Sequence, residues 1–179
     1  MDQSKIRQGV RLILEGIGED LTREGLQDTP KRVAEMYQEI LEGNDQQPQL
    51  ESGFSEEMAE DIIILKDIPF YSMCEHHMLP FFGKVHLAYI PKSNKVSGFS
   101  SLTRLIDLYA KRLQIQERLT QQIANAVMKF LDPMGVLVLV EAQQLCVSMR
   151  GSKKDSVRTI TQAIRGKIPE NCLQMIKSS

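Results

Sequence analysis

The chain has 179 residues and a formal net charge of −1, which fits a domain of ordinary size that can bury a core without disulfide support. Because the charges nearly balance, they exclude a bulk electrostatic footprint for nucleic acid or an anionic membrane, and any anion site must be local. The N-terminal segment MDQSKIRQGV lacks the apolar stretch of a signal peptide, and the longest aliphatic runs, 62–65 and 136–140, are too short to span a bilayer. We therefore expect a soluble, cytoplasmic protein.

The first part of the chain is predicted to be helical. Apolar residues recur at helical spacing over 4–15, and Asp28 with the proline two residues later marks the start of another helix. A polar stretch over 44–55 predicts a surface loop. We therefore expect a helical N-terminal region at residues 1–55 and a second domain at residues 56–179.

The second domain is predicted to mix strands and helices. A short buried strand is expected over 62–65, and another over 84–90. Ser100 and Ser101 mark the start of a helix, and a further helix is expected around 119–130. Two consecutive helices between strands favour an α+β fold over strictly alternating units.

The C-terminal part is predicted to begin with a long strand. This strand opens at 136–140 and is expected to continue through Cys146 towards Arg150. A short helix is expected after Pro169. Cys172 lies in that stretch, and we interpret it as a packing residue of the helix.

The segment Cys74-Glu75-His76-His77 contains one of three cysteines and two of three histidines. An odd number of widely spaced cysteines is not a secreted disulfide framework, which favours metal or catalytic use. Spacing of the C-x-x-H type lets a thiolate and an imidazole in one tight turn reach the same ion, and zinc is the natural candidate. The alternative is a buried thiol beside surface histidines.

Cys146 is the candidate third ligand. In an unbroken strand, Gln144, Cys146, Ser148 and Arg150 would share one face. Three protein ligands would leave a fourth position for water, as in catalytic zinc sites. His76 would then be available for acid–base work or for holding a substrate group. The alternatives are an inert core cysteine and a surface histidine.

Two helix starts offer polar groups for a ligand. Arg104 lies one turn into the helix that begins at Ser100 and Ser101, where hydroxyls, free N–H groups and a guanidinium would suit a phosphate. Gln116 and Glu117 begin the next helix and would suit the donor and acceptor edge of a base. An ordinary capped helix and a solvated helix turn are the alternatives.

Four segments, taken in order, resemble the GTP cyclohydrolase I family: DTPKRVAEMY, FYSMCEHHMLPFFGKVHLAYIP, GFSSLTRLIDLYAKRLQIQERLTQQIA and VLVEAQQLCVSMRG. The similarity extends from about Ile6 to the end of the chain. The resemblance implies the tunnelling fold, in which an antiparallel sheet packs on a pair of long helices. It further implies a helical N-terminal extension, a catalytic domain over 56–179 and a toroidal homodecamer with active sites at subunit interfaces.

The resemblance also implies roles for individual residues. The implied zinc ligands are Cys74, His77 and Cys146. The implied guanine contacts are Gln116 and Glu117. The implied triphosphate contacts are Ser100, Arg104 and Arg150, together with Arg32 from another subunit. His76 matches the histidine that works beside the metal.

The implied reaction is the zinc-dependent hydrolysis of GTP to 7,8-dihydroneopterin triphosphate and formate, the first step of folate and pterin biosynthesis. Water adds at C8, where zinc assists by lowering the pKa of its bound water. Opening of the imidazole ring gives a formamide, and a second hydrolysis releases formate. An Amadori rearrangement of the ribose and ring closure complete the product.

Two positions depart from the family pattern. Gln144 stands where the family has an acid–base histidine, and glutamine cannot shuttle a proton near neutral pH. Ser101 stands where the family has a lysine on the triphosphate. Three hypotheses follow: a slower but complete cyclohydrolase, a divergent purine-nucleotide hydrolase that stops at the formamide or takes a less phosphorylated substrate, and a non-catalytic subunit that binds pterins or nucleotides.

Overall fold

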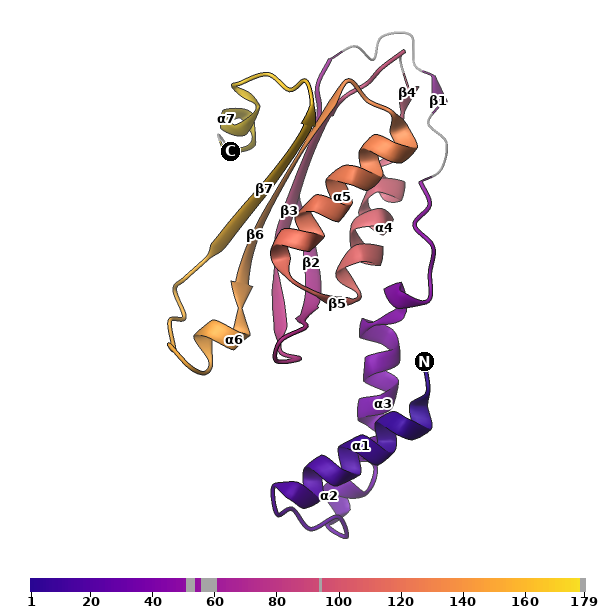
Figure 1. The fold of residues 1–179 in the computed structure, drawn as a ribbon, viewed down its shortest axis with the longest axis vertical. Helices are drawn as coiled ribbons and strands as arrows, with labels where there is room; N and C mark the ends of the chain where they lie inside the picture. Colours follow the sequence, from indigo (N-terminus) through magenta and orange to yellow (C-terminus); the bar gives the residue numbers. More distant parts are fainter. Residues whose placement is uncertain (51–53, 56–60, 94, 178–179) are drawn as a thin grey trace.

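The computed structural model describes residues 1–50, 54–55, 61–93 and 95–177. Its centre is a five-stranded sheet in the order β5-β2-β3-β6-β7 (Figure 1). The strands are β2 (Ile63–Cys74), β3 (Pro80–Ile90), β5 (Leu113–Gln114), β6 (Gly135–Gln144) and β7 (Thr159–Gly166). Neighbouring strands are antiparallel, except that β5 pairs with β2 in parallel.

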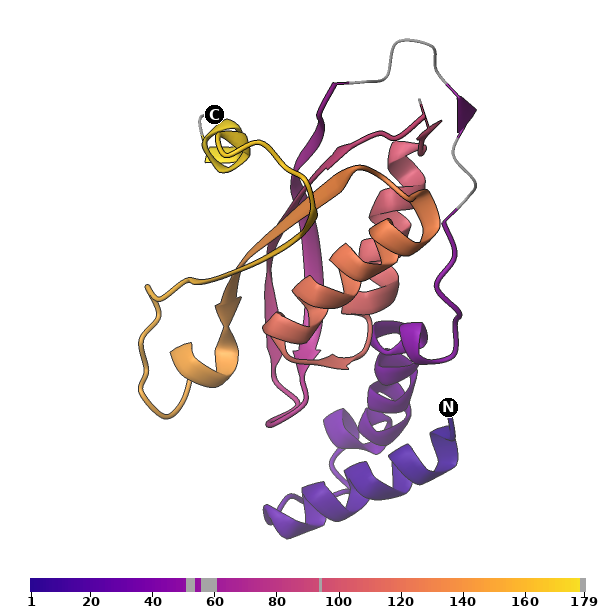
Figure 2. The ribbon, with the colours of Figure 1, turned by 45° about the horizontal axis from the view of Figure 1, so that its top comes forward.

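Two helices, α4 (Phe99–Ala110) and α5 (Gln116–Leu131), cover one face of the sheet (Figures 1 and 2). Along β6, Val136, Val138 and Val140 belong to the core between sheet and helices. Leu137 and Leu139 instead join a smaller cluster with α7 (Cys172–Lys177). This alternation is the two-residue period of a strand buried on both faces. The expected α+β class, with an antiparallel sheet packed on a pair of helices, is confirmed.

The N-terminal part is helical and projects beyond one end of the sheet (Figure 2). It contains α1 (Gln3–Gly16), α2 (Glu24–Gln27), α3 (Thr29–Ile40) and the 3-10 helix η1 (Glu42–Asn44), and α1 packs along α3. Gly43 joins this part to the end of α4, because its N–H donates to the Lys111 carbonyl at 3.0 Å. A Cβ at this position would lie 2.2 Å from the Leu108 carbonyl oxygen, so the close approach requires glycine.

The helices predicted in the N-terminal part are present, although Asp28 does not cap α3 with its side chain. The predicted loop is only partly a loop, because residues 54 and 55 form β1 (Phe54–Ser55), which pairs with β4 (Lys95–Val96). Residues 51–53 of that loop, and residue 56 at the expected domain boundary, lie outside the described residues. The boundary stays a prediction. Over the part of the chain that the structure describes, no helix is long and apolar enough to cross a membrane.

The long strand expected to run through Cys146 is wrong. β6 ends at Gln144, and the next residues form a short helix, α6 (Leu145–Ser148). The partner strand explains this end, because the β3–β6 pairing stops at Phe81 opposite Gln144. The next residue of β3 in that direction is Pro80, which has no N–H to donate to a ladder. Cys146 and Arg150 therefore do not share a strand face with Gln144.

Two strands differ from their sequence-based predictions. β2 extends from Ile63 to Cys74, far beyond the predicted 62–65, because the strand continues past a bulge between Leu65 and Ile68. Asp67 at this bulge has φ 56, which breaks the alternation that the sequence pattern relies on. β7 was not predicted at all. The predicted strand 84–90 and the helix after Pro169 are present as β3 and α7.

Candidate functional site

Two thiols and an imidazole meet at one end of the sheet. Cys74 ends β2, His77 lies in the turn between β2 and β3, and Cys146 lies in α6. The ligand atoms of these three residues all lie within 4.8 Å of one another. Cys74 is buried, Cys146 is half-buried and His77 is exposed, so the group is open to solvent on one side. The structure thus brings together the three residues expected to bind a metal.

The turn that carries His77 is stabilised locally. The N–H of Cys74 donates to the Leu79 carbonyl at 2.9 Å, and the N–H of Met78 donates back to the Cys74 carbonyl at 2.8 Å. Met78 has φ 51, in the left-handed region that lets the chain reverse tightly. This closed turn returns the His77 side chain to the level of Cys74. The C-x-x-H spacing therefore works as the sequence predicts.

The donor set fits a soft or borderline divalent cation. Burial raises the pKa of the Cys146 thiol, and the neighbouring Cys74 raises it further. Two thiols this close do not both ionise readily without a cation, whereas a divalent ion stabilises both thiolates. Two sulfurs and one imidazole nitrogen are ligands that zinc prefers, and the set leaves room for a fourth ligand.

His76 lies beside this group and is exposed. Its Nδ1 is 3.9 Å from the Cys74 Sγ, and its Nε2 is 4.0 Å from the Glu75 carboxylate. The side chain therefore reaches both the candidate ligands and solvent. This position suits the proton-transfer role expected from the sequence. The contacts of His76 with Cys74 and Glu75 do not by themselves assign that role.

Glu75 and Arg118 form a contact that sequence reasoning missed. The two terminal nitrogens of the Arg118 guanidinium, Nη1 and Nη2, donate to the two Glu75 carboxylate oxygens. The Nη2–Oε1 distance is 3.1 Å. The hydrogen bond from Arg118 holds the pKa of the Glu75 carboxyl below its ordinary value. Arg118 lies in the first turn of α5, so this pair joins that turn to the turn between β2 and β3 that carries His77. The two residues are 43 positions apart, and no local pattern indicates the contact.

The two residues expected to contact guanine differ in their environment. Glu117 is exposed on the first turn of α5, where its carboxylate is accessible to a ligand. Gln116 is only 3% exposed, and its side-chain NH₂ group lies 3.1 Å from the Val140 carbonyl oxygen and 2.9 Å from that of Thr159. The Gln116 amide is thus engaged within the chain, and only Glu117 presents its side chain outwards.

Gln144 is also held within the chain. Its Nε2 donates to the Gln116 Oε1 at 2.8 Å. Gln144 is the N-cap residue of α6, and Cys146 follows two residues later. The hydrogen bond therefore links the start of α5 to the helix that carries a candidate metal ligand.

Ser100 and Arg104 lie in the first half of α4, which starts at the opposite end of the sheet from the candidate metal ligands. The C-terminal end of α4 is near the metal turn, because the Ser72 hydroxyl donates to the Ala110 carbonyl at 2.7 Å. Ser100 stands ten residues earlier, or about 15 Å along the helix axis. Figure 1 shows the same arrangement, with the start of α4 beside β4 at the opposite end of the sheet. Within the described chain, Ser100 does not come together with the candidate metal ligands.

Ser101 is buried at the start of α4 and is 3% exposed. The Arg104 Nη2 donates to its hydroxyl oxygen at 3.1 Å. Ser101 therefore packs inside the subunit rather than extending into solvent. Its hydroxyl oxygen accepts from Arg104 and carries no formal charge.

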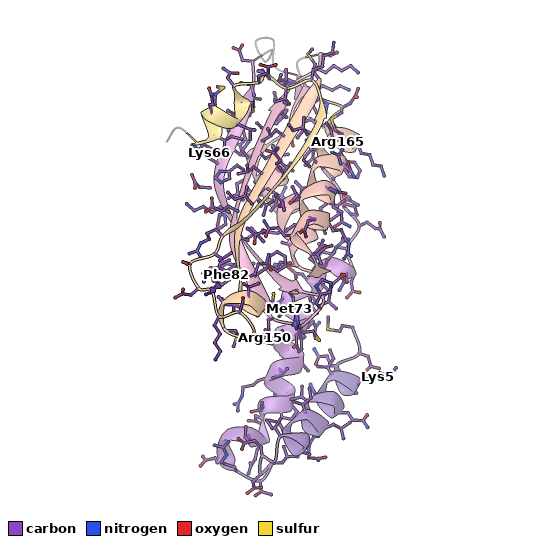
Figure 3. All side chains as sticks on the ribbon, turned by 60° about the vertical axis from the view of Figure 1, so that its left-hand side comes forward. Lys5, Lys66, Met73, Phe82, Arg150 and Arg165 are labelled. Carbon is purple, nitrogen blue, oxygen red and sulfur yellow. The ribbon has the colours of Figure 1, made fainter. Side chains whose placement is uncertain are left out.

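The remaining predicted arginines occupy different ends of the chain. Arg150 follows α6 and is exposed, and Figure 3 shows it at the same end of the sheet as Met73, the residue before Cys74. Arg32 belongs to α3, where its guanidinium donates to the Gly25 carbonyl at 3.2 Å and lies 4.0 Å from Asp28. Arg150 is thus near the candidate metal ligands, whereas the contacts described for Arg32 stay within the N-terminal part.

A family model described as GTP cyclohydrolase I matches residues 6–176. GTP cyclohydrolase 1 of Carboxydothermus hydrogenoformans is 57% identical over 168 residues, which cover 93% of this chain and 87% of that protein. GTP cyclohydrolase 1 of Brevibacillus brevis is 54% identical over 168 residues, which cover 93% and 89%. Among solved structures, the apo form of a QueF-like archaeosine synthase aligns with a TM-score of 0.48 and 22% identity over 60% of this chain and 96% of that chain.

Proposed function

The chain belongs to the GTP cyclohydrolase I family, and we propose that it hydrolyses GTP to 7,8-dihydroneopterin triphosphate and formate. The observation that supports this most strongly is that the ligand atoms of Cys74, His77 and Cys146 lie within 4.8 Å of one another, beside the turn of α5 that carries the exposed Glu117. An open metal site next to an exposed carboxylate suits hydrolysis of a purine ring. The proposal places the reaction between these two features.

Zinc is the metal that this site would hold, bound by Cys74, His77 and Cys146. The set of two thiols and one imidazole supports zinc over magnesium or calcium, which prefer oxygen ligands. When bound, zinc supplies Lewis acidity that makes a water molecule nucleophilic near neutral pH. The remaining chemistry belongs to the side chains around it.

Glu117 would bind the guanine base. Its carboxylate accepts from the N–H groups on the pyrimidine edge, which orients the imidazole edge towards the metal. The first hydrogen bond within α5 runs from the Leu119 N–H to the Ile115 carbonyl, so the N–H groups of the three preceding residues have no partner within the helix. These N–H groups and the helix dipole suit the guanine carbonyl oxygen. Gln116 supports this turn and does not offer its side chain to the base.

His76 would move the protons that ring opening requires. An imidazole exchanges protons near neutral pH, and this one is exposed beside Cys74. With Gln144 in place of a second histidine, His76 would carry more of the acid–base work. Slower release of formate is the expected consequence.

The triphosphate would be bound by residues from more than one copy of the chain. Arg150 lies at the end of the sheet where Met73 precedes the candidate ligand Cys74 (Figure 3). Ser100 lies about 15 Å along α4 from that end, and Arg104 about 9 Å. Arg32 stays in the N-terminal part. A neighbouring copy that places the start of its α4 beside the candidate metal ligands would complete the anion site, which supports a homo-oligomer with shared active sites. The form that we propose for it, a toroidal homodecamer, rests on the family resemblance alone.

The proposal is tested by incubating the zinc-loaded protein with GTP. We expect formate release and, after oxidation, a fluorescent pterin in equal amounts. Loss of purine absorbance without formate would support a second function, a hydrolase that stops at the formamide. Gln144 favours this function because it leaves His76 as the one imidazole proposed for the later proton transfers. No GTP turnover at all would contradict both.

A further inference from the structure

The side-chain amide of Gln116 has a fixed orientation. Its Nε2 faces the carbonyl oxygens of Val140 and Thr159 at 3.1 and 2.9 Å, and the Thr161 hydroxyl at 3.2 Å. Carbonyl oxygens only accept hydrogen bonds, so they determine which side of the amide carries the NH₂ group. The Gln116 Oε1 must therefore point the other way.

The side chain of Gln144 contacts that oxygen. The Gln144 Nε2 donates to the Gln116 Oε1 at 2.8 Å. Gln116 is 3% exposed, and a buried amide oxygen without a donor is costly. The residue at position 144 consequently has to donate a hydrogen bond. A glutamine and a histidine both satisfy this requirement, whereas a proton carrier is not needed for it.

The first turn of α5 is held by further bonds around Gln116. The Thr120 hydroxyl donates to the Gln116 carbonyl at 2.8 Å and lies 2.7 Å from the Thr161 hydroxyl. Thr120 is fully buried. These contacts join the turn to β6 and β7, while the exposed Glu117 stands on the same turn. The backbone that carries Glu117 is therefore set by Gln116.

We propose that Gln144 is a positioning residue for substrate binding: it fixes Gln116, and through Gln116 the turn that presents Glu117 to the guanine base. This inference rests on the proposed function. It assigns position 144 a role that depends on hydrogen-bond donation and is distinct from proton transfer. It also accounts for a glutamine where the family has a histidine.

The test compares Gln144→Leu with a matched control, Gln143→Leu. Gln143 precedes Gln144 on β6, but its Nε2 donates to the Asp155 carbonyl at 3.1 Å, away from α5. In the zinc-loaded protein, Gln144→Leu should raise the KM for GTP about tenfold, the loss of one hydrogen bond to a buried partner. The kcat should change less, and Gln143→Leu should keep the wild-type KM. Gln144→His, which restores a donor, should rescue the KM.

A second readout does not depend on activity. Hydrogen exchange measured by mass spectrometry should be faster over residues 115–121 in Gln144→Leu than in wild type, and unchanged in Gln143→Leu. An unchanged KM in Gln144→Leu, with or without a lower kcat, would overturn the positioning role. Unchanged exchange over this turn would overturn it as well. Absence of GTP turnover in the wild-type chain would instead overturn the proposed function, so the two failures are distinguishable.

Discussion

Arg118 in the first turn of α5 donates hydrogen bonds from both of its terminal nitrogens to the carboxylate of Glu75, the residue that follows Cys74. The pair connects the turn that presents Glu117 to the turn that presents His77. Together with the Gln144–Gln116 bond, it attaches the start of α5 at two points. The distance between the proposed base-binding carboxylate and the proposed metal therefore depends on side chains that contact neither.

Glu75→Gln should reduce kcat/KM for GTP while leaving the melting temperature nearly unchanged. The pair is partly exposed, so its contribution to folding is small, but a shift of about 1 Å between base and metal costs up to roughly 10²-fold in rate. Steady-state kinetics and thermal unfolding measure the two effects. Lys84→Gln is the control, because it removes another surface ion pair, with Asp67 at 2.7 Å, outside the site. Equal losses of rate in both variants would contradict the account.

Gln144→His should speed the steps after ring opening. A histidine keeps the donor that Gln116 requires, and its second nitrogen can exchange protons near neutral pH. General acid–base groups contribute about 10²–10⁴-fold, so formate release should rise relative to loss of purine absorbance. Parallel assays of formate and absorbance measure this ratio. An unchanged formate rate would show that position 144 limits no proton-transfer step.

Stability should fall below about pH 6.5 because of His86. This side chain is 7% exposed, and its Nδ1 accepts from the Asp67 N–H at 3.2 Å, which requires the neutral ring. Burial lowers the pKa of His86; Lys66 and Lys84 add to this, and Asp67 and Glu141 oppose it. The unfolded chain binds the proton first, so stability is complete above the ordinary pKa and is lost as the pH falls towards the folded value.

The free energy of unfolding should change by at most about 1.4 kcal/mol per pH unit, the limit for one titrating group. His86→Asn keeps an acceptor without titrating, so its stability should depend less on pH between 7.5 and 5.5. Denaturant unfolding of both proteins at equal zinc loading measures the difference. If the free energy of unfolding depended on pH in the same way in wild type and in His86→Asn, His86 would not be the group responsible.

Gly83→Ala should destabilise the sheet between β3 and β6. A Cβ at residue 83 would lie 1.9 Å from the Glu141 carbonyl oxygen, so β3 and β6 would have to separate. We expect a loss of roughly 1–3 kcal/mol, as for other overpacked positions. Gly9→Ala is the matched control, because nothing lies within 4 Å of the new methyl group in α1. That variant should gain about 0.5–1 kcal/mol, and a comparable loss in both would be inconsistent with this cause.

The local parts of the site follow from the sequence. Cys74 and His77 are three residues apart in one turn, so their spacing alone predicts that they meet. The apolar pattern likewise predicts α4 and α5. These features depend on neighbouring residues and need no knowledge of the rest of the fold. The expected capping by Ser100 and Ser101 is wrong, because the N-cap of α4 is Gly98, which has no side chain that could cap the helix.

The remaining features depend on partners distant in the sequence. β6 ends where β3 reaches Pro80, which the pattern around Cys146 does not reveal. The orientation of Gln116 depends on Thr159 and Thr161, in a strand that the sequence did not predict. The separation of Ser100 from the metal ligands follows from the direction in which α4 crosses the sheet. No periodicity encodes that direction.

Two cysteine variants test whether a zinc ion held by Cys74, His77 and Cys146 is needed for GTP hydrolysis. Cys146→Ala removes a proposed ligand, whereas Cys172→Ala makes the same change in the apolar cluster beneath α7. Metal content and formate release should be measured on both proteins and on wild type. We expect one zinc per chain and formate release for wild type and Cys172→Ala, and loss of both for Cys146→Ala. Full zinc content together with undiminished formate release in Cys146→Ala would contradict this expectation.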